Sequence, residues 1–241
     1  MTAILLAALV LCSYTVGTLA GFGSNVLIVT LASHLMPVQE LLPILLPLNL
    51  ALNGWLVMRH GRHVDRRLLL RLALLMAPGV AVGVVVFFVG SGALLKTLLG
   101  AFVLCVGVLE LLHHARGARS PALPRLLAWP LLAVAGVFQG LFASGGPLAV
   151  WVVARELPDK ASFRATLAAL WLLLNGAVLS SYAAGGLLDA TSLRATAPLL
   201  LPFAAALIAG ERLHDRIDQQ RFRLLVFALL ALGGAALLAS R

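Results

Sequence analysis

The chain has 241 residues, of which 61% are hydrophobic and only 11% are charged. Such an apolar composition excludes a soluble domain and indicates an all-α protein that crosses a membrane several times. The net charge of +9 does not indicate nucleic-acid binding, because the lysines and arginines occupy short gaps between apolar runs, as they do in cytoplasmic loops.

The first apolar run, residues 1–39, contains no Lys, Arg, Asp or Glu and is too long for a single span. A helix needs about 20 residues to cross the hydrocarbon core. Three glycines, Ser24 and Asn25 interrupt the run within the stretch 17–25. We therefore expect a hairpin at 3–36, made of two half-helices that meet inside the membrane.

The second half of the chain repeats this organisation after a basic linker loop at 116–125. A charge-free segment, 126–154, is broken by the stretch Gly136–Pro147, and we expect a second hairpin there. Charged and Pro/Gly-rich gaps delimit six further apolar segments, which we predict to be helices, at 41–58, 68–90 and 94–113 in the first half and at 163–184, 193–210 and 222–240 in the second.

An ordered series of identities indicates that 1–115 and 126–241 are two repeats of one structural unit. When the halves are laid against each other from the breaks onward, glycine, proline and Asn-Gly positions coincide. Gly21 corresponds to Gly140, Pro37 to Pro158, Asn53-Gly54 to Asn175-Gly176, Asp65 to Asp189 and Pro78 to Pro202.

The loop charges predict that the two repeats have inverted topology. Loops rich in Lys and Arg in one half correspond to poor loops in the other. If each hairpin enters and leaves on the same side, fifteen of the eighteen basic residues share one face, whereas eight single crossings would divide them almost evenly. We therefore expect cytoplasmic basic loops and both termini outside. The charges leave open whether each hairpin is re-entrant or consists of two short spans.

Several of these features resemble the TauE/SafE family of sulfite-exporter-like permeases. The resemblance rests on the glycine break, the Pro37 and Pro158 turns, the two Asn-Gly pairs, the basic loop that ends at Asp65, and the ending Gly210–Arg216 before an apolar helix. It implies a multi-pass permease of the bacterial inner membrane that carries small anions, with sulfite and organosulfonates the usual substrates.

The candidate site consists of neutral groups at mid-depth, because the acidic residues and histidines lie in loops or near segment ends. Free N–H groups at the start of a half-helix point at a ligand together with the positive end of the helix dipole, which suits an anion. No metal-ligand spacing and no cofactor motif is present in the sequence. The predicted substrate-binding residues are Gly23, Ser24, Asn25, Asn49, Asn53, Gln139, Ser144, Gly145, Gly146, Trp171 and Asn175.

Some of these residues have a second interpretation. Ser24 and Ser144 could cap their half-helices. Asn49 and Asn53 share one helix face, where they would serve either as hydrogen bonds between helices or as part of a substrate path. Asn175 is the repeat equivalent of Asn53. For Gly79 and Gly83 we expect a packing role, because small residues let membrane helices approach closely.

The leading functional hypothesis is a secondary transporter, an exporter of a small anion such as sulfite or an organosulfonate, that works by alternating access. A proton or sodium is the candidate coupling ion, and the choice stays open. The alternatives are an anion channel and an intramembrane hydrolase that uses Ser144, for which the sequence offers no base at matching depth. No P-loop is present. The expected environment is the lipid bilayer, and both a monomer and a homodimer remain open.

Overall fold

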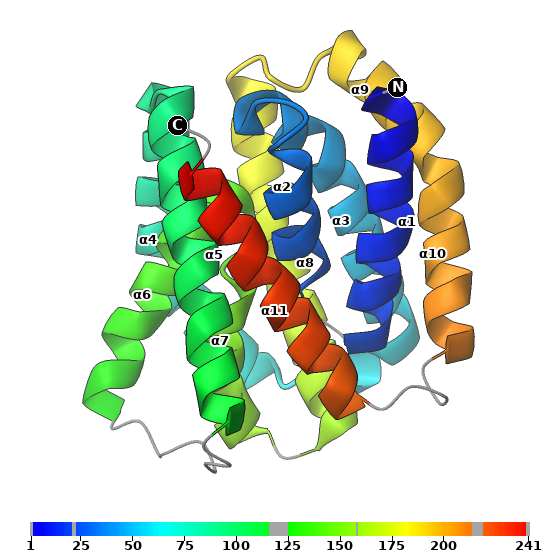
Figure 1. Cartoon of the computed structure of the whole chain (residues 1–241). Helices are drawn as coiled ribbons and strands as arrows, with labels where there is room; N and C mark the ends of the chain where they lie inside the picture. The colour runs from blue at the N-terminus through cyan, green and yellow to red at the C-terminus, as the bar shows by residue number, and fades with distance from the viewer. Residues whose placement is uncertain (1, 21–22, 116–124, 158, 214–218, 240–241) are drawn as a thin grey trace. The chain divides into compact units, whose positions relative to one another are not determined.

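The computed structural model describes residues 2–20, 23–115, 125–157, 159–213 and 219–239, and every regular element in these ranges is helical (Figure 1). Residues 116–124 of the predicted linker lie outside the description. The helices are α1 (Thr2–Ala20), α2 (Ser24–Ala32), α3 (Val38–His60), α4 (Arg66–Val89), α5 (Gly92–Ala115), α6 (Arg125–Phe142), α7 (Gly146–Glu156), α8 (Lys160–Ala184), α9 (Ala190–Thr196), α10 (Leu200–Leu213) and α11 (Gln219–Ala239), with 3-10 turns η1 (Gly61–His63) and η2 (Ala197–Leu199).

Both predicted breaks are confirmed. The first broken segment consists of α1 and α2, and the second consists of α6 and α7. The helical stretch predicted at 193–210 lies within the helical stretch Ala190–Leu213, which consists of α9, η2 and α10 instead of one regular helix. Pro198 has no N–H to donate to the carbonyl of the preceding turn, and the chain tightens into a 3-10 turn there.

Five helical stretches are long and apolar enough to cross a membrane, namely Val38–His63, Arg66–Val89, Gly92–Leu112, Ala161–Ala184 and Ala190–Leu213. Three shorter apolar stretches accompany them, at Ala3–Leu19, Ala128–Phe142 and Leu224–Ala239. Two of the shorter stretches are the first half-helices of the broken segments. These lengths and compositions agree with a multi-pass membrane protein.

The chain forms two compact units. The first comprises Met1–Leu41, Gly90–Pro121 and Pro198–Arg241, and the second comprises Leu42–Val89 and Ala122–Ala197. The first unit therefore contains α1, α2, α5, α10 and α11, whereas the second contains most of α3 together with α4 and α6 to α9. These units are not the predicted repeats, because each unit combines segments from both halves of the chain. The repeats describe similarity along the sequence and remain a prediction.

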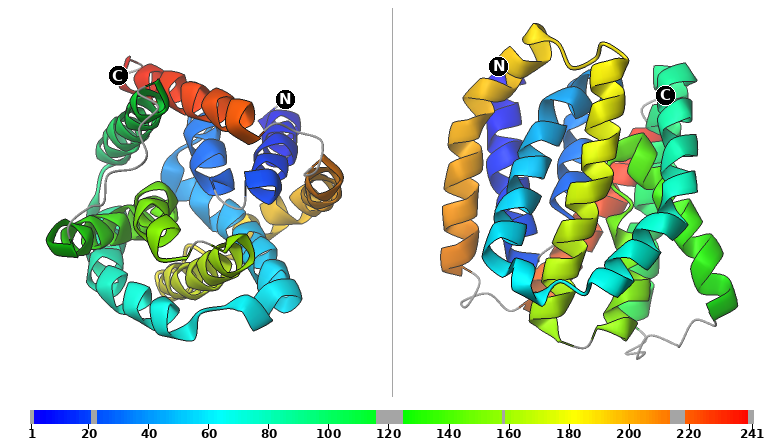
Figure 2. Two further views of the ribbon diagram at one scale, coloured as in Figure 1. Left: turned by 90° about the horizontal axis from the view of Figure 1, so that it is seen from below. Right: turned by 180° about the vertical axis from the view of Figure 1, so that it is seen from behind.

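In the first unit, α1 packs along α10, and α11 packs against α5 (Figures 1 and 2). Small residues make both contacts close. A Cβ atom at Gly210 would fall 2.5 Å from Cβ of Thr18, and one at Gly107 would fall 2.9 Å from Cβ of Ala231. The ring of Tyr14 meets Phe203 edge-on, with 5.0 Å between the centroids.

In the second unit, α4 and α6 approach each other through two glycines on each helix, and the two are four residues apart on both. A Cβ atom at Gly79 would lie 2.1 Å from the carbonyl oxygen of Ala133, and one at Gly83 would lie 2.2 Å from that of Val137. The same holds in return for Gly136 and Gly140, whose added Cβ atoms would meet main-chain atoms of α4. The predicted packing role of Gly79 and Gly83 is confirmed, because no larger residue fits at such a backbone-to-backbone crossing.

Candidate functional site

The break in the second unit is a turn of three residues between α6 and α7. Ala143 has φ 50°, in the left-handed region that non-glycine residues rarely adopt, and it is the one such residue in the described part of the chain. Gly145 packs so tightly on α6 that a Cβ atom would lie 2.2 Å from the carbonyl oxygen of Ala135. Pro147, in the first turn of α7, has no N–H to leave unsatisfied. Gly145 and Pro147 therefore suit this turn, whereas Ala143 is strained in it.

The interpretation of Ser24 and Ser144 as helix caps is wrong. The residues at the N-cap positions are Gly23, with φ 89°, and Gly145, and neither can offer a side chain. Ser24 is instead the first residue of α2, and Ser144 Oγ donates to the carbonyl oxygen of Phe142 at 2.8 Å.

Gln139 closes the open end of α7 in place of a serine. The N–H of Gly145 donates to Oε1 of Gln139 at 2.9 Å. This bond joins the last turns of α6 to the start of α7 across the break. One of the donors that every helix leaves unpaired at its beginning is thereby satisfied.

A continuous chain of side-chain amides extends from this bond through three helices. Gln139 Nε2 donates to Oδ1 of Asn175 on α8, and Asn175 Nδ2 donates to Oδ1 of Asn49 on α3 at 2.8 Å. Asn53, one turn further along α3, donates to the same Asn49 Oδ1 at 2.7 Å. We call these four side chains and the Gly145 N–H the amide chain. None of the four side chains is more than 5% exposed.

The amide chain brings together five of the predicted site residues, and three more adjoin it. Trp171 lies one turn before Asn175 on α8, and its Cζ2 would be 3.7 Å from a Cβ atom at Gly146. Ser144 is also buried. The remaining three predicted residues, Gly23, Ser24 and Asn25, belong to the first unit, where Ser24 packs against Gly17.

The asparagines differ in whether their hydrogen bonds join helices. Asn49 and Asn175 do join helices, as the packing interpretation requires. The hydrogen bonds of Asn53 stay within α3, to the main-chain oxygen and Oδ1 of Asn49. In all the hydrogen bonds described for Asn49, its oxygens accept. Its Nδ2 is therefore available to donate to a ligand.

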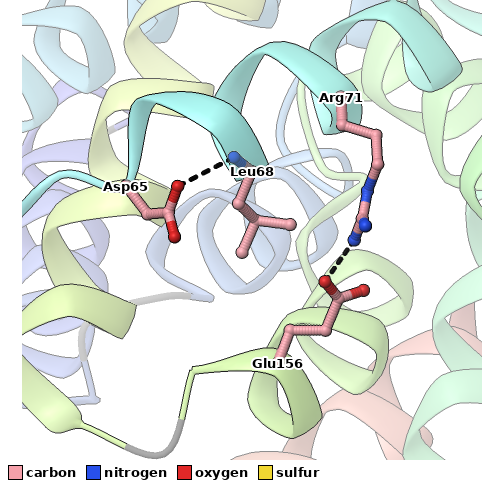
Figure 3. Close-up of polar contacts among 4 residues, drawn as sticks. All are labelled: Asp65, Leu68, Arg71 and Glu156. Atoms are coloured by element: carbon pink, nitrogen blue, oxygen red, sulfur yellow. Dashed lines mark hydrogen bonds and ion pairs between the residues drawn. The ribbon is translucent and has the colours of Figure 1, made fainter.

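Polar contacts at the beginning of α4 fix the end of α7 (Figure 3). Arg71 and Glu156 form an ion pair, with half and about a third of their side chains exposed. Asp65 caps α4 by accepting the Leu68 N–H at 2.9 Å, and its own N–H donates to Thr166 on α8. Such an exposed pair contributes only about 0–1 kcal/mol to stability. It does show that α7 ends beside the first turns of α4.

Two further helix starts carry acidic caps outside the apolar helices. Asp159 precedes α8 and Asp189 precedes α9, where Ser192 completes a capping box. The Ser162 and Ser192 N–H groups donate to these carboxylates and hold the pKa of each below its ordinary value. Both carboxyls therefore stay ionised, and each stabilises a helix beginning.

One acidic residue is less peripheral than the sequence suggests. Glu110 was expected near a helix end, but α5 continues to Ala115 and Glu110 is only 8% exposed. It belongs to the first unit and makes no part of the amide chain.

Comparison with known proteins decides the family. The model of the sulfite exporter TauE/SafE family matches residues 5–237, nearly the whole chain. The chain belongs to the TauE/SafE family. It is also 28% identical over 185 residues to the probable inner membrane transporter protein TsaS of Comamonas testosteroni, an alignment that covers 75% of this chain and 77% of the relative. No solved structure is significantly similar to it.

Membership of the TauE/SafE family makes this chain a multi-pass membrane transporter and not an enzyme. The hypothesis of a hydrolase that uses Ser144 is therefore wrong. The contacts of Ser144 agree, because its hydroxyl donates to a main-chain oxygen. A nucleophile would need to donate to a base.

Proposed function

We propose that this TauE/SafE protein transports a small oxoanion, such as sulfite or an organosulfonate, across the inner membrane, and that the anion binds at the amide chain. The observation that carries the proposal is the buried series Asn53, Asn49, Asn175 and Gln139, which ends on the first N–H groups of α7. Such a site is built from uncharged hydrogen-bond donors beside the positive end of a helix dipole.

Neutral donors suit a transported anion better than a charged residue would. A lysine or arginine at this depth would be costly to bury and would hold the anion tightly in an ion pair. Amide and main-chain N–H groups are weaker donors and leave release fast. The donors we assign to the anion are the Nδ2 of Asn49, which donates to none of the described residues, and the N–H of Gly146; Trp171 covers the site from α8.

Packing supports inverted repeats as the basis of alternating access. The first half-helix of each broken segment packs on the second long helix that follows the broken segment of the other half, since α1 lies along α10 and α6 along α4. The Arg71–Glu156 pair supports a hairpin that returns to the side from which α4 starts. With the loop charges, this favours cytoplasmic basic loops and outside termini.

A panel of ligands tests the proposal on purified protein. A ligand that binds only the folded state stabilises it by about 2.7 kcal/mol at a hundred times its dissociation constant. We expect sulfite or methanesulfonate to raise the unfolding temperature and acetate at equal ionic strength to leave it unchanged. Equal shifts for all anions, or none, would contradict a specific oxoanion site.

Flux measurements separate a carrier from a channel. Vesicles that contain the protein and unlabelled sulfite should accumulate labelled sulfite transiently against its gradient, because a carrier exchanges one bound anion for another. A channel would let the label equilibrate without accumulation. Vesicles with the variant Asn49→Ala give the control for leakage, since the same amount of protein is inserted without its site.

A further inference from the structure

Tyr182 is a buried tyrosine whose hydroxyl has no assigned role in the fold. The side chain is 0% exposed, and its hydroxyl has no hydrogen-bond partner among the described residues. A buried hydroxyl that gives up water without a new partner destabilises the folded protein. In a native structure such a group calls for an explanation, and a hydrogen-bond acceptor that binds there is one.

The position of Tyr182 relates it to the amide chain. It follows Asn175 by seven residues on α8, which places both side chains on one face, about two turns apart. Its ring stacks on Phe87 of α4, with 4.9 Å between the centroids. Phe87 lies one turn beyond Gly83, which contacts Gly140 just before the break.

The aromatic neighbours hold the tyrosine ring in one place. Phe87 is buried and stacks on the ring, and Phe88 meets it nearly edge-on with 6.1 Å between the centroids. Stacked and edge-on aromatic contacts of this kind stabilise the ring arrangement beyond the effect of the buried area. The hydroxyl is therefore presented by a rigid support, which lowers the entropy cost of binding a ligand.

We propose that the Tyr182 hydroxyl donates a hydrogen bond to an oxygen of the transported oxoanion as it passes between the amide chain and the nearby end of α8. The inference rests on the proposed function and names a binding residue of the same path. Tyr182 is then a second hydrogen-bond donor to the anion. It lies about 10 Å along α8 from Asn175, because an α-helix rises about 1.5 Å per residue. The donor is uncharged, like those of the amide chain, and its acceptor is an anionic oxygen.

The variant Tyr182→Phe removes only the hydroxyl and keeps the aromatic packing. Because a hydrogen bond to a charged group is worth about 1.5–3 kcal/mol, we expect sulfite or methanesulfonate binding to weaken about 10- to 100-fold. The unfolding temperature without ligand should stay the same or rise, since an unpaired buried group is removed. Whatever happens to that temperature, an unchanged anion titration would overturn the proposal.

Tyr14 provides the matched control, since it is the other tyrosine of the chain and is equally buried. It belongs to the first unit, and the variant Tyr14→Phe should bind the anion as the wild type does. Equal weakening in both variants would contradict a specific role for Tyr182.

A second measurement needs no change at Tyr182. When Tyr14→Phe protein is produced with 3-fluorotyrosine, its single fluorine signal comes from position 182. We expect sulfite to shift this signal in a saturable way with the dissociation constant of the thermal titration. A signal that does not respond, in protein that binds the anion, would refute contact at the hydroxyl. Absence of any anion effect on wild-type protein would instead refute the proposed function.

Discussion

The N–H of Gly145 donates to Oε1 of Gln139 at 2.9 Å, so the beginning of α7 is closed by a side chain of the helix that precedes it. The same glutamine donates through Nε2 to Asn175. The turn between the half-helices and the contact between α6 and α8 therefore depend on one amide group.

Replacing Gln139 with leucine should destabilise the protein strongly. The variant leaves the Gly145 N–H and Asn175 Oδ1 buried without these partners, at about 1–3 kcal/mol for each. We expect a clear fall in the unfolding temperature in detergent. The control is Gln39→Leu, which loses one hydrogen bond, to the carbonyl oxygen of Gly90. Equal losses in the two variants would show that the Gln139 bonds contribute little.

Replacement of Asn53 and of Asn175 by alanine should separate transport from stability. Asn53 bonds only within α3, so Asn53→Ala should change the unfolding temperature little and yet reduce anion flux. Asn175 joins α8 to both α3 and α6, and Asn175→Ala should lower stability and flux together. Unchanged flux in folded Asn53→Ala protein would remove this residue from the substrate path.

A single methyl group at Gly83 should disrupt the crossing of α4 and α6. An alanine there would place its Cβ atom 2.2 Å from the carbonyl oxygen of Val137, so the helices would have to separate. The control is Gly54→Ala, whose Cβ atom would lie 3.9 Å from the nearest side chain. Alanine favours a helix by about 1 kcal/mol over glycine, so the control should be neutral or stabilising. Similar thermal unfolding of the two variants would contradict the crossing.

Glycine at position 143 should stabilise the break. Ala143 has φ 50°, a conformation that costs an L-residue about 1–2 kcal/mol and a glycine almost nothing. Part of this gain is offset by the greater freedom of glycine in the unfolded chain, so we expect a rise of about 0.5–1 kcal/mol in the free energy of unfolding. Ala149→Gly, in the interior of α7, should lower it by a similar amount. A fall in both variants would argue against strain at Ala143.

The sequence predicts the broken segments because their cause is local. An uncharged run of 39 residues cannot be one span, and glycines in its middle cannot hold a straight helix. The spacing of Asn49 and Asn53 predicts their common face for the same reason. The sequence predicts the ends of the long helices to within a few residues, except where Pro198 divides α9 from α10.

The partners of these polar groups could not be predicted, because they come from helices distant in sequence. Gln139 caps α7 only because α6 and α7 fold back on each other. From the sequence alone, the usual N-cap preference favours serine. Tyr182 was missed as a candidate. Its spacing of seven residues from Asn175 was a usable signal, but its burial and its unpaired hydroxyl are properties of the packed α4 and α8.

The glycine crossing also limits how the second broken segment can move. Gly83 and Gly140 bring two main chains into direct contact, with no side chains between them that could change rotamer. A rearrangement of this segment would then leave α6 fixed to α4 as one rigid piece. We expect such a rearrangement to move residues 143–145 and α7, and it would require the Gly145 N–H to release Oε1 of Gln139.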